Sequence, residues 1–523
     1  MLQNPAATET FQGANNIEAT EPFTHGPTGI FSRIWPIYNY ELPKFFSITA
    51  LMFCILFIQN VIRATKDSVV NTMIGPESVS FLKVWGVMPA AILYAIIYVK
   101  LVNKFKPETL FNIVISAFIG LFLFFGLIVF PYSNYIHLSK ESANSIILLY
   151  PNFKWFILLG ANWGYSLFYV VAELWPNAAY SVLFWQFINS VTNVDESRRF
   201  YPMFALFGQT GLYISGSLLV AQTSIGIFLH KNFGLGATPT IASLQFIMFV
   251  VIALAAASLL IFRFINLHIL DVRGNDVVKF KGGRKKTMGL MESLRLIASS
   301  RYILLIAVML TCYGISINLV EGPWKKMVAN MYSSTEDNLA FVGSYLRMTG
   351  IITLAFVLVG SNIVRFLGWF SAAIITPFMM FVTGCIFYYS ANFESDLLTF
   401  ICITIGYDPI MLAIVFGAIH NVITKSTKYT LFDSTKEMAY VPLDDDLKTR
   451  GKAAVDSISV KFGKSASAFI QSSIFFLFPA ATFESICPYL MFVFVIVCFF
   501  WMWAVLSLAK QYDKLTSKEI LEE

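Results

Sequence analysis

Long apolar runs separated by short polar stretches recur from residue 44 almost to the C-terminus. A helix needs about 20 mostly apolar residues to cross the hydrocarbon core of a bilayer, and the runs have this length. They predict an all-α membrane protein with about twelve transmembrane helices, the fourth of which bends at Trp175-Pro176. The predicted spans are 45–63, 80–102, 109–131, 152–190, 200–222, 241–265, 302–325, 340–364, 369–390, 397–423, 453–479 and 485–509.

Matched stretches in the first and second six spans indicate an internal duplication. Their offsets lie between 255 and 264 residues and their order is the same in both halves. Such a six-plus-six layout is that of major-facilitator-like transporters, whose substrate site lies near the midplane between two pseudo-symmetric halves. The pairs are Asn60-Val-Ile-Arg63 with Asn318-Leu-Val-Glu321, Phe81-Leu-Lys-Val-Trp-Gly86 with Tyr345-Leu-Arg-Met-Thr-Gly350, and Phe207-Gly-Gln-Thr210 with Phe462-Gly-Lys-Ser465.

The polar segments outside the spans divide the chain further. We expect residues 1–43 to form a disordered polar arm, 44–266 the first six-helix half, 267–300 a basic linker, 301–510 the second half and 511–523 a tail. Basic residues concentrate in alternate loops, which places the arm, the linker and the tail in the cytoplasm. The polar arm has no basic stretch followed by a short apolar core, so we expect no cleavable signal peptide.

Composition agrees with this interpretation and excludes several classes of protein. The chain is 57% hydrophobic and 13% charged, whereas an average soluble domain has about 25% charged residues. Its net charge of +6 comes mainly from the short loops, so it reports topology and does not indicate nucleic-acid binding. The six cysteines lie in or beside apolar runs without a CxxC pair, and we expect no metal site, disulfide or cofactor.

Charged residues inside predicted spans are the main candidates for function. A charge at mid-membrane is costly, so it usually faces a cavity and marks a transport pathway. The spacings place Arg63 with Lys66, and Glu321 with Lys325, on shared helix faces. The candidates are Arg63, Lys66, Asp67, Lys83, Glu173, Glu321, Lys325, Lys326, Arg347, Asp408, His420, Lys425, Lys428, Lys461 and Lys464.

This set is rich in cations, which indicates a polyanionic substrate such as the phosphate chain of a nucleotide. Glu173 and Glu321 would balance the cations in an empty site and could carry a proton. Other interpretations stay open: residues near span ends can reach the membrane interface, and Lys425 and Lys428 can be loop residues. Glu173 and Lys464 can form structural ion pairs.

Further side chains have both a functional and a structural interpretation. His420 is interpreted as a core residue, and Asp408 as a possible helix cap. A base could stack on one of the aromatic residues around Glu173, although packing explains most membrane aromatics. No enzyme motif has the right context, since Gly463-Lys464-Ser465 lacks the leading glycine of a phosphate loop.

Several of these residues stand in longer motifs that resemble the ATP/ADP translocase (nucleotide transporter) family of obligate intracellular bacteria and plastids. The resemblance runs from about residue 35 to 510. Its motifs are Thr65-Lys66-Asp67, Ala-Glu-Leu-Trp at 172–175, Leu-Phe-Trp at 183–185, Asn-Leu-Val-Glu at 318–321, Trp324-Lys325, the stretch 428–443, Gly451-Lys-Ala-Ala-Val-Asp456 and Gly463-Lys-Ser465.

The resemblance implies that Lys66, Glu173, Glu321 and Lys464 are required for transport, because they fall on the family's essential lysines and glutamates. The chain departs from exchangers of ATP for ADP at Pro176-Asn177 and at Gly322-Pro323. Relatives with this pattern include carriers of other nucleotides, some of them proton-coupled.

We therefore expect a nucleotide transporter of the bacterial inner membrane that works by alternating access and is a monomer. Its substrate would be ATP, ADP or another nucleoside triphosphate, and exchange of ATP for ADP is the leading interpretation. Proton-coupled or exchange uptake of UTP, CTP or GTP is the alternative, and a membrane-embedded nucleotide-using enzyme is a remote one. The expected site consists of Lys66, Glu173, Glu321, Lys464, Arg63, Lys325, Lys425 and Lys428.

Overall fold

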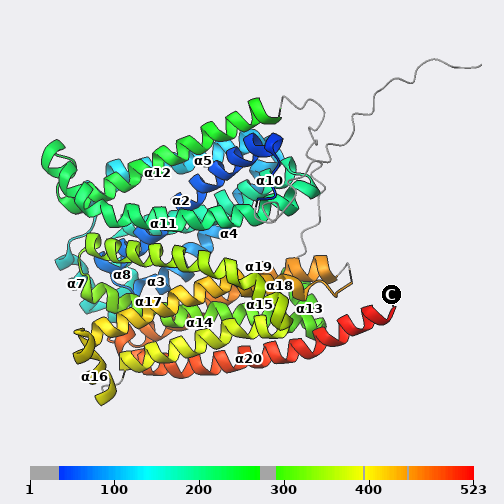
Figure 1. Cartoon of the computed structure of the whole chain (residues 1–523). Coiled ribbons are helices and arrows are strands. Elements are labelled where there is room, and N and C mark those ends of the chain that lie inside the picture. The colour runs from blue at the N-terminus through cyan, green and yellow to red at the C-terminus, as the bar shows by residue number, and fades with distance from the viewer. Residues whose placement is uncertain (1–34, 271–289, 393–394, 445–446, 523) are drawn as a thin grey trace, which may run out of the picture.

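Helices laid side by side make up almost all of the chain that the computed structural model describes, which is residues 35–270, 290–392, 395–444 and 447–522 (Figure 1). Eleven helices in these ranges are long and apolar enough to cross a membrane. The eleventh predicted span, 453–479, is also a long helix, α19 (Lys452–Leu477), but it is not among these eleven. The prediction of an all-α membrane protein with major-facilitator-like halves is confirmed.

The first half contains α2 (Leu42–Met73), α4 (Met88–Lys104), α5 (Pro107–Phe124), α9 (Trp163–Trp175), α11 (Val194–Phe233) and α12 (Pro239–Phe264). The second contains α14 (Arg301–Met331), α15 (Thr335–Asn392), α17 (Pro409–Thr427), α19 and α20 (Phe483–Glu522). Residue Gly368 has φ 77°, so the chain turns within α15, which holds two spans, Thr335–Val357 and Gly368–Asn392. α20 continues through most of the predicted tail.

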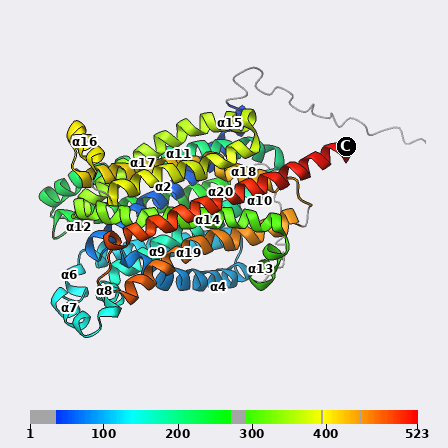
Figure 2. The same cartoon turned by 90° about the horizontal axis from the view of Figure 1, so that it is seen from below.

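Shorter elements complete the described chain. π-Helical turns prolong several spans: η2 (Leu82–Val87), η3 (Phe125–Val129), η5 (Pro176–Phe184), η6 (Ile265–Leu270), η8 (Lys428–Phe432) and η9 (Leu447–Gly451). The other short pieces are η1 (Asn39–Glu41), α3 (Ser78–Phe81), α6 (Ser133–Ile136), α7 (Lys140–Leu149), η4 (Pro151–Phe153), α8 (Lys154–Ala161), α10 (Trp185–Val191), α13 (Leu290–Ser299), α16 (Asp396–Ile405) and α18 (Asp433–Ala439). Figure 2 shows α7 and α8 at the same end of the molecule as α16, far from the C-terminus.

Several predicted boundaries differ from the structure. The run 152–190 is not one span, because α8 ends before Asn162 and the span is Trp163–Val191, with the expected bend formed by the π-helical turn η5. The run 397–423 is also divided, into the short α16 and a span from Pro409 to Ala439. α2 extends ten residues past the predicted end at Arg63, because its charges face a cavity and do not stop the helix.

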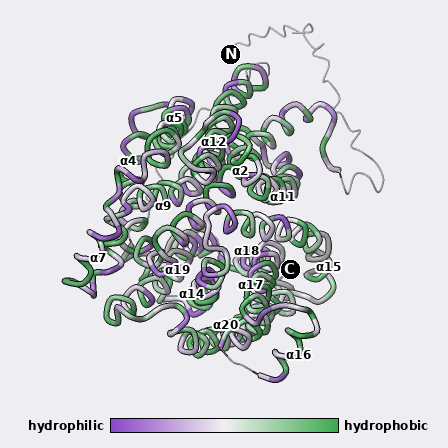
Figure 3. The backbone as a smooth tube through the Cα atoms, turned by 90° about the vertical axis from the view of Figure 1, so that its left-hand side faces the viewer, coloured by the Kyte–Doolittle hydropathy of each residue, from purple (hydrophilic) through white to green (hydrophobic). Residues whose placement is uncertain are grey.

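The two predicted halves each have their own apolar core. Residues from Ile37 to Ile265 form most of one core, and residues from Ile297 to Ala509 form most of the other. Viewed from one end, the helices of the two halves occupy separate regions of the molecule, with apolar positions widespread on both (Figure 3). The last residues of the predicted arm join the first core, where Trp35 contacts the rings of Phe45 and Phe207.

The halves touch most closely where α11 crosses α15. A Cβ atom on Gly216 would lie 2.5 Å from the carbonyl oxygen of Gly343, and one on Gly343 would lie 2.7 Å from the carbonyl oxygen of Gly216. Only glycine permits such an approach of two backbones. Further contacts between the halves join α3 and η2 to α19, and α2 to α14 and α15.

One end of the molecule also holds the halves together by polar contacts, and we call it the joined end. The carboxylate of Glu77, only 1% exposed, lies 3.3 Å from Lys326 Nζ and accepts from the backbone N–H of Phe483 at 3.3 Å. The hydroxyls of Thr72 and Thr335 lie 2.7 Å apart. At the opposite end, which carries α13 and the C-terminus (Figure 1), the ion pairs Arg199–Glu41 and Lys452–Glu437 each join elements of one half.

Candidate functional site

Two adjoining cavities lie between the halves at the level of Arg63 and Glu321. The first, here called the charged cavity, has a volume of about 380 Å³ and is lined by α2, η2, α9, α14, α17, η8, α18 and α19. The second, the aromatic cavity, has a volume of about 340 Å³ and lies mainly between α2, α11, α14 and α15. The cavities share Arg63, Asp67, Glu321, Lys325, Lys425 and Tyr429. Both volumes are in the range of small-molecule sites.

All eight predicted site residues line the charged cavity, and they come from both halves. α2 positions Arg63 and Lys66, and α9 positions Glu173, while the second half contributes Glu321 and Lys325 from α14. The rest come from α17, η8 and α19, namely Lys425, Lys428 and Lys464. Interfacial snorkelling therefore does not explain Lys66 or Lys325, because both face the interior between the halves.

Six of the charged residues form a ladder of alternating sign across the interface. Lys66 Nζ lies 3.0 Å from the Glu173 carboxylate and 2.7 Å from that of Asp67. Asp67 in turn lies 3.0 Å from Lys325 Nζ, and this ion pair links the first half to the second.

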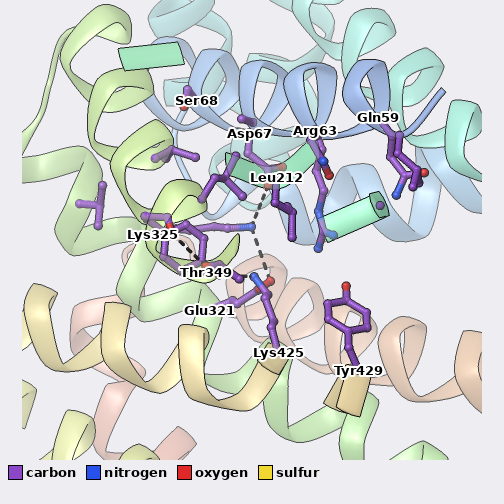
Figure 4. A pocket seen from close by; sticks show the side chains of 18 of the residues that line it. Gln59, Arg63, Asp67, Ser68, Leu212, Glu321, Lys325, Thr349, Lys425 and Tyr429 are labelled. Carbon is purple, nitrogen blue, oxygen red and sulfur yellow. Dashed lines mark hydrogen bonds and ion pairs between the residues drawn. The ribbon is translucent and has the colours of Figure 1, made fainter. Parts of the chain in front are cut away.

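The ladder continues on the second half, where Glu321 lies between two lysines. Its carboxylate is 3.7 Å from Lys325 Nζ and 3.0 Å from Lys425 Nζ (Figure 4). In the low-dielectric interior each pair is far stronger than in water, and each charge needs its neighbours to offset desolvation. The ladder thus joins the two halves at the level of the cavities.

Aromatic side chains support the lysines at two points of the ladder. Lys66 Nζ lies 3.8 Å from the centre of the Tyr169 ring, which attracts a cation through its π-electrons. At the other end, Lys425 donates to the hydroxyl of Tyr345 at 2.7 Å. These contacts fix where each ammonium group sits, so the ladder lysines are held in defined positions before any substrate enters.

Other cations in the charged cavity are not balanced by a carboxylate. Within the described part of the chain, no acidic group lies within ion-pair distance of Arg63 or Lys464, and both side chains are exposed to the cavity. Lys83 donates to the amide oxygen of Asn318 at 2.6 Å and has no carboxylate partner there either. Counted over both cavities, eight cationic and five acidic side chains leave an excess of three positive charges. Such a site is suited to a polyanion.

The structure adds residues that the predicted site left out. Asp67 is the central acid of the ladder, although the sequence marked it only as an intramembrane charge. Asn318 holds Lys83, and the signal that could have found it is its match with Asn60 in the repeat. The mouth of the cavity adds Lys436, which lies 3.3 Å from Asp456. Both residues lie in the motif stretches 428–443 and 451–456, but nothing else in the sequence indicates that they line a site.

Three further candidate charges, His420, Asp408 and Arg347, line neither cavity, and the side chain of Lys461 lies outside the described part of the structure. His420 is fully buried and its Nδ1 lies 2.8 Å from the Thr383 hydroxyl, which agrees with a core residue. Asp408 occupies the position before α17, but its side chain makes no capping hydrogen bond. Arg347 lies over the ring of Tyr213, near the crossing of α11 and α15.

The aromatic residues around Glu173 are mostly packed in the core. Phe168 and Trp175 are fully buried, and the Trp175 indole N–H donates to the carbonyl oxygen of Ile55 at 3.1 Å. Tyr169 reaches the charged cavity, but Lys66 already covers its ring. No other ring of this cluster lines either cavity, so the cluster offers a base in the cavities no uncovered ring.

The prolines that mark the two departures from the exchanger pattern have structural roles. Pro323 lies inside α14 and cannot donate to the carbonyl oxygen of Leu319, four residues earlier. That oxygen instead accepts from the Tyr388 hydroxyl at 3.0 Å. Gly322 leaves room for the Phe483 ring, which would lie 2.5 Å from a Cβ atom. Pro176 is the first residue of the π-helical turn η5, where it follows the span that carries Glu173.

Comparison with known proteins identifies relatives over nearly the whole chain. Residues 25–512 match the model of the TLC ATP/ADP transporter family. The chain is 52% identical over 481 residues to the ADP,ATP carrier protein 4 of Rickettsia bellii, covering 92% of each protein. It is 43% identical to the ADP,ATP carrier protein 3 of the same species, covering 92% of this chain and 97% of the relative.

Solved transporter structures share the fold at low sequence identity. A bacterial homologue of the iron transporter ferroportin superposes with a TM-score of 0.57 at 12% identity, over 88% of this chain and 98% of the other. A point mutant of the nucleoside transporter NupG gives a TM-score of 0.52 at 11% identity, over 89% of this chain and 99% of the other. These likenesses support the arrangement of the helices.

Proposed function

This chain belongs to the TLC ATP/ADP transporter family, and from that premise we propose that it exchanges ATP for ADP across a bacterial inner membrane by alternating access. The observation that carries the proposal is the excess of three positive charges in the two cavities between the halves. Since the family consists of transporters, the remote alternative of a membrane-embedded enzyme is set aside.

The phosphate chain binds in the charged cavity, where Arg63 and Lys464 face it from opposite halves. Their charges have no carboxylate partner in the described chain, so they are available to phosphate oxygens without breaking an ion pair. Guanidinium and ammonium groups form charge-assisted hydrogen bonds to such oxygens. Lys428 assists near the mouth, at the cost of its 2.7 Å contact with Asp433.

The ladder couples binding to movement of the halves. The link between Asp67 and Lys325 is its only step from one half to the other within the described chain. Phosphates compete with Asp67 for Lys325 and with Glu173 for Lys66, so substrate weakens the ladder as it binds. The halves can then rock about the contact between α11 and α15, exposing the cavity to the other side.

We place both termini in the cytoplasm and treat the transporter as a monomer. Basic groups of α13, α18 and η9 lie at the end that carries the C-terminus, as the positive-inside rule expects of a cytoplasmic face. Both cavities are lined by residues of one chain, so one copy supplies the whole proposed site.

A direct test is uptake of radiolabelled ATP, GTP, CTP and UTP by intact bacteria that express the chain, with and without a proton uncoupler, followed by a chase with unlabelled ADP. Exchange predicts that ATP enters, that the uncoupler has no effect, and that ADP releases the label. Uptake of another nucleotide that the uncoupler blocks and ADP does not chase would overturn the exchange mechanism. Proton-coupled import, with Glu173 and Glu321 as proton sites, would then replace it.

A further inference from the structure

The aromatic cavity differs in chemistry from the charged cavity beside it. All five of its charged residues are shared with the charged cavity. The residues that line the aromatic cavity alone are uncharged and mostly apolar, and they include Met52, Leu56, Tyr180, Phe204 and Leu212. Away from the wall that the two cavities share, a phosphate chain has no cation to bind, but a flat, weakly polar ring has apolar surface to contact.

Four carboxamides break the apolar lining of this cavity, at Gln59, Asn60 and Asn71 of α2 and at Asn338 of α15. The Oε1 atom of Gln59 is buried without a hydrogen-bond partner in the described chain. A buried polar atom without a partner costs about 1–3 kcal/mol, and this one belongs to a side chain that lines the cavity (Figure 4). An amide left in this way indicates a ligand with polar groups of its own.

The position of Gln59 relative to the cations suits one end of a nucleotide. Gln59 lies one helical turn before Arg63 and two turns before Lys66, so its Cα is about 10 Å from that of Lys66 along the axis of α2. Arg63 lines both cavities and stands between the two environments. A ligand with phosphates at Lys66 and Lys464 would therefore extend past Arg63 toward Gln59.

An aromatic face stands across the shared region from α2. Tyr429 lines both cavities, and 42% of it is exposed. Figure 4 shows its ring opposite Arg63 and Gln59. Stacking on such a ring is worth about 1–3 kcal/mol for any base, so Tyr429 would add affinity without selecting a base.

We propose that the aromatic cavity is the nucleobase subsite, in which the Gln59 carboxamide selects adenine and Tyr429 stacks on the ring. This inference rests on the proposed function and names the part of the site that recognises the base. A carboxamide presents a donor and an acceptor side by side, which match the N7 acceptor and the N6 amino donor of adenine. Guanine presents two acceptors, N7 and O6, on the corresponding edge and does not match.

The test compares ligands with and without a base on the purified, full-length protein in lipid nanodiscs. Binding of ADP, GDP and pyrophosphate is measured by calorimetry for the wild type and for Gln59→Leu. The variant should bind ADP at least tenfold more weakly and pyrophosphate as the wild type does. A matched control is Gln186→Leu, because Gln186 accepts from Tyr98 at 2.8 Å and lines neither cavity.

A second variant tests base selectivity, so that the result does not depend only on a loss of affinity. Gln59→Glu keeps an acceptor and removes the donor, so the ratio of ADP to GDP affinity should fall at least tenfold, because a carboxylate accepts from the ring N–H and amino group of guanine. Unchanged ADP binding in Gln59→Leu together with an unchanged ratio in Gln59→Glu would overturn the base subsite and leave the proposed function standing. If the wild type binds pyrophosphate but no adenine nucleotide, the proposed function fails as well.

Discussion

At the scale of single residues, the cations of the charged cavity fall into two groups with different expected effects. Lys66, Lys325 and Lys425 form ion pairs with carboxylates of the ladder. Arg63 and Lys464 have no carboxylate partner among the described residues. Loss of a ladder residue disturbs the folded protein as well as the site. Loss of an unpaired cation should disturb only the site.

Lys464→Ala tests the second group. We expect ATP uptake to fall at least a hundredfold, because the variant removes a phosphate contact and leaves no buried carboxylate behind. Thermal stability in detergent should stay within a few degrees of the wild type. The measurement is uptake per amount of protein in the membrane, and Lys464→Arg, which keeps the charge, should retain part of the activity. Normal uptake by Lys464→Ala would remove this residue from the site.

Asp67→Asn tests the first group. Asp67 neutralises both Lys66 and Lys325, so its loss leaves two buried ammonium groups without their shared partner. Breaking a buried ion pair in this way costs about 3–5 kcal/mol, and we expect a clear drop in the unfolding temperature. The double variant Asp67→Asn/Lys325→Met removes one of the stranded charges and should recover part of the loss. Equal stability of the single variant and the wild type would mean that the ladder does not hold the halves.

At the scale of elements, two contacts between the halves are expected to have opposite roles during transport. The joined end has to open for the cavities to become accessible from its side of the membrane. The crossing of α11 and α15 has to persist while the halves rock. The polar groups of the joined end can bind water when the halves separate there. The backbone contact between Gly216 and Gly343 is a packing contact that water does not replace.

Glu77→Gln should loosen the joined end. It removes the charge that holds Lys326 while leaving an oxygen for the backbone of Phe483. We expect a membrane-impermeant thiol reagent, added to intact cells, to label Thr335→Cys faster in the Glu77→Gln background. Glu484→Gln is the matched control, since Glu484 accepts from Asn330 at the same end but within one half. Labelling that is no faster than in the control would show that Glu77 does not keep this end closed.

Gly216→Leu should prevent the close crossing of α11 and α15. Its side chain would overlap the backbone of Gly343, so the halves must separate or the protein must fail to accumulate. We expect less protein in the membrane, a lower unfolding temperature and little transport. Gly120→Leu is the control, because a Cβ there meets no other atom within 4 Å. Wild-type behaviour of Gly216→Leu would contradict the crossing seen in the structure.

At the scale of the whole molecule, the sequence predicts the fold better than it predicts the contacts within the site. Apolar runs report helices, and the confirmed family resemblance reports how they are arranged. Hydropathy fails at Lys66 and Asp67, because it assumes that charges end a span, whereas α2 carries them through the membrane facing the other half. The same assumption shortened the span that contains Glu321.

The partners of each charge could not be predicted from one sequence. Spacing places Glu321 and Lys325 on one helix face, but it does not show that Asp67, some 258 residues away, lies 3.0 Å from Lys325 Nζ. Nor does it show that Tyr429, next to a site lysine, lines the same cavity as Gln59. Such pairings depend on how the two halves meet, which only the folded chain shows.

The excess of positive charge in the cavities affects how a cell that carries this protein obtains phosphoryl groups and adenine. An unloaded cavity would have to close around unbalanced charges, whereas one that holds ATP or ADP is close to neutral, so the empty carrier should return far more slowly than the loaded one. Each incoming adenine is then matched by an outgoing one. The cell obtains phosphoryl groups through this route while its adenine pool stays constant, and it needs a separate supply of purine before it can grow.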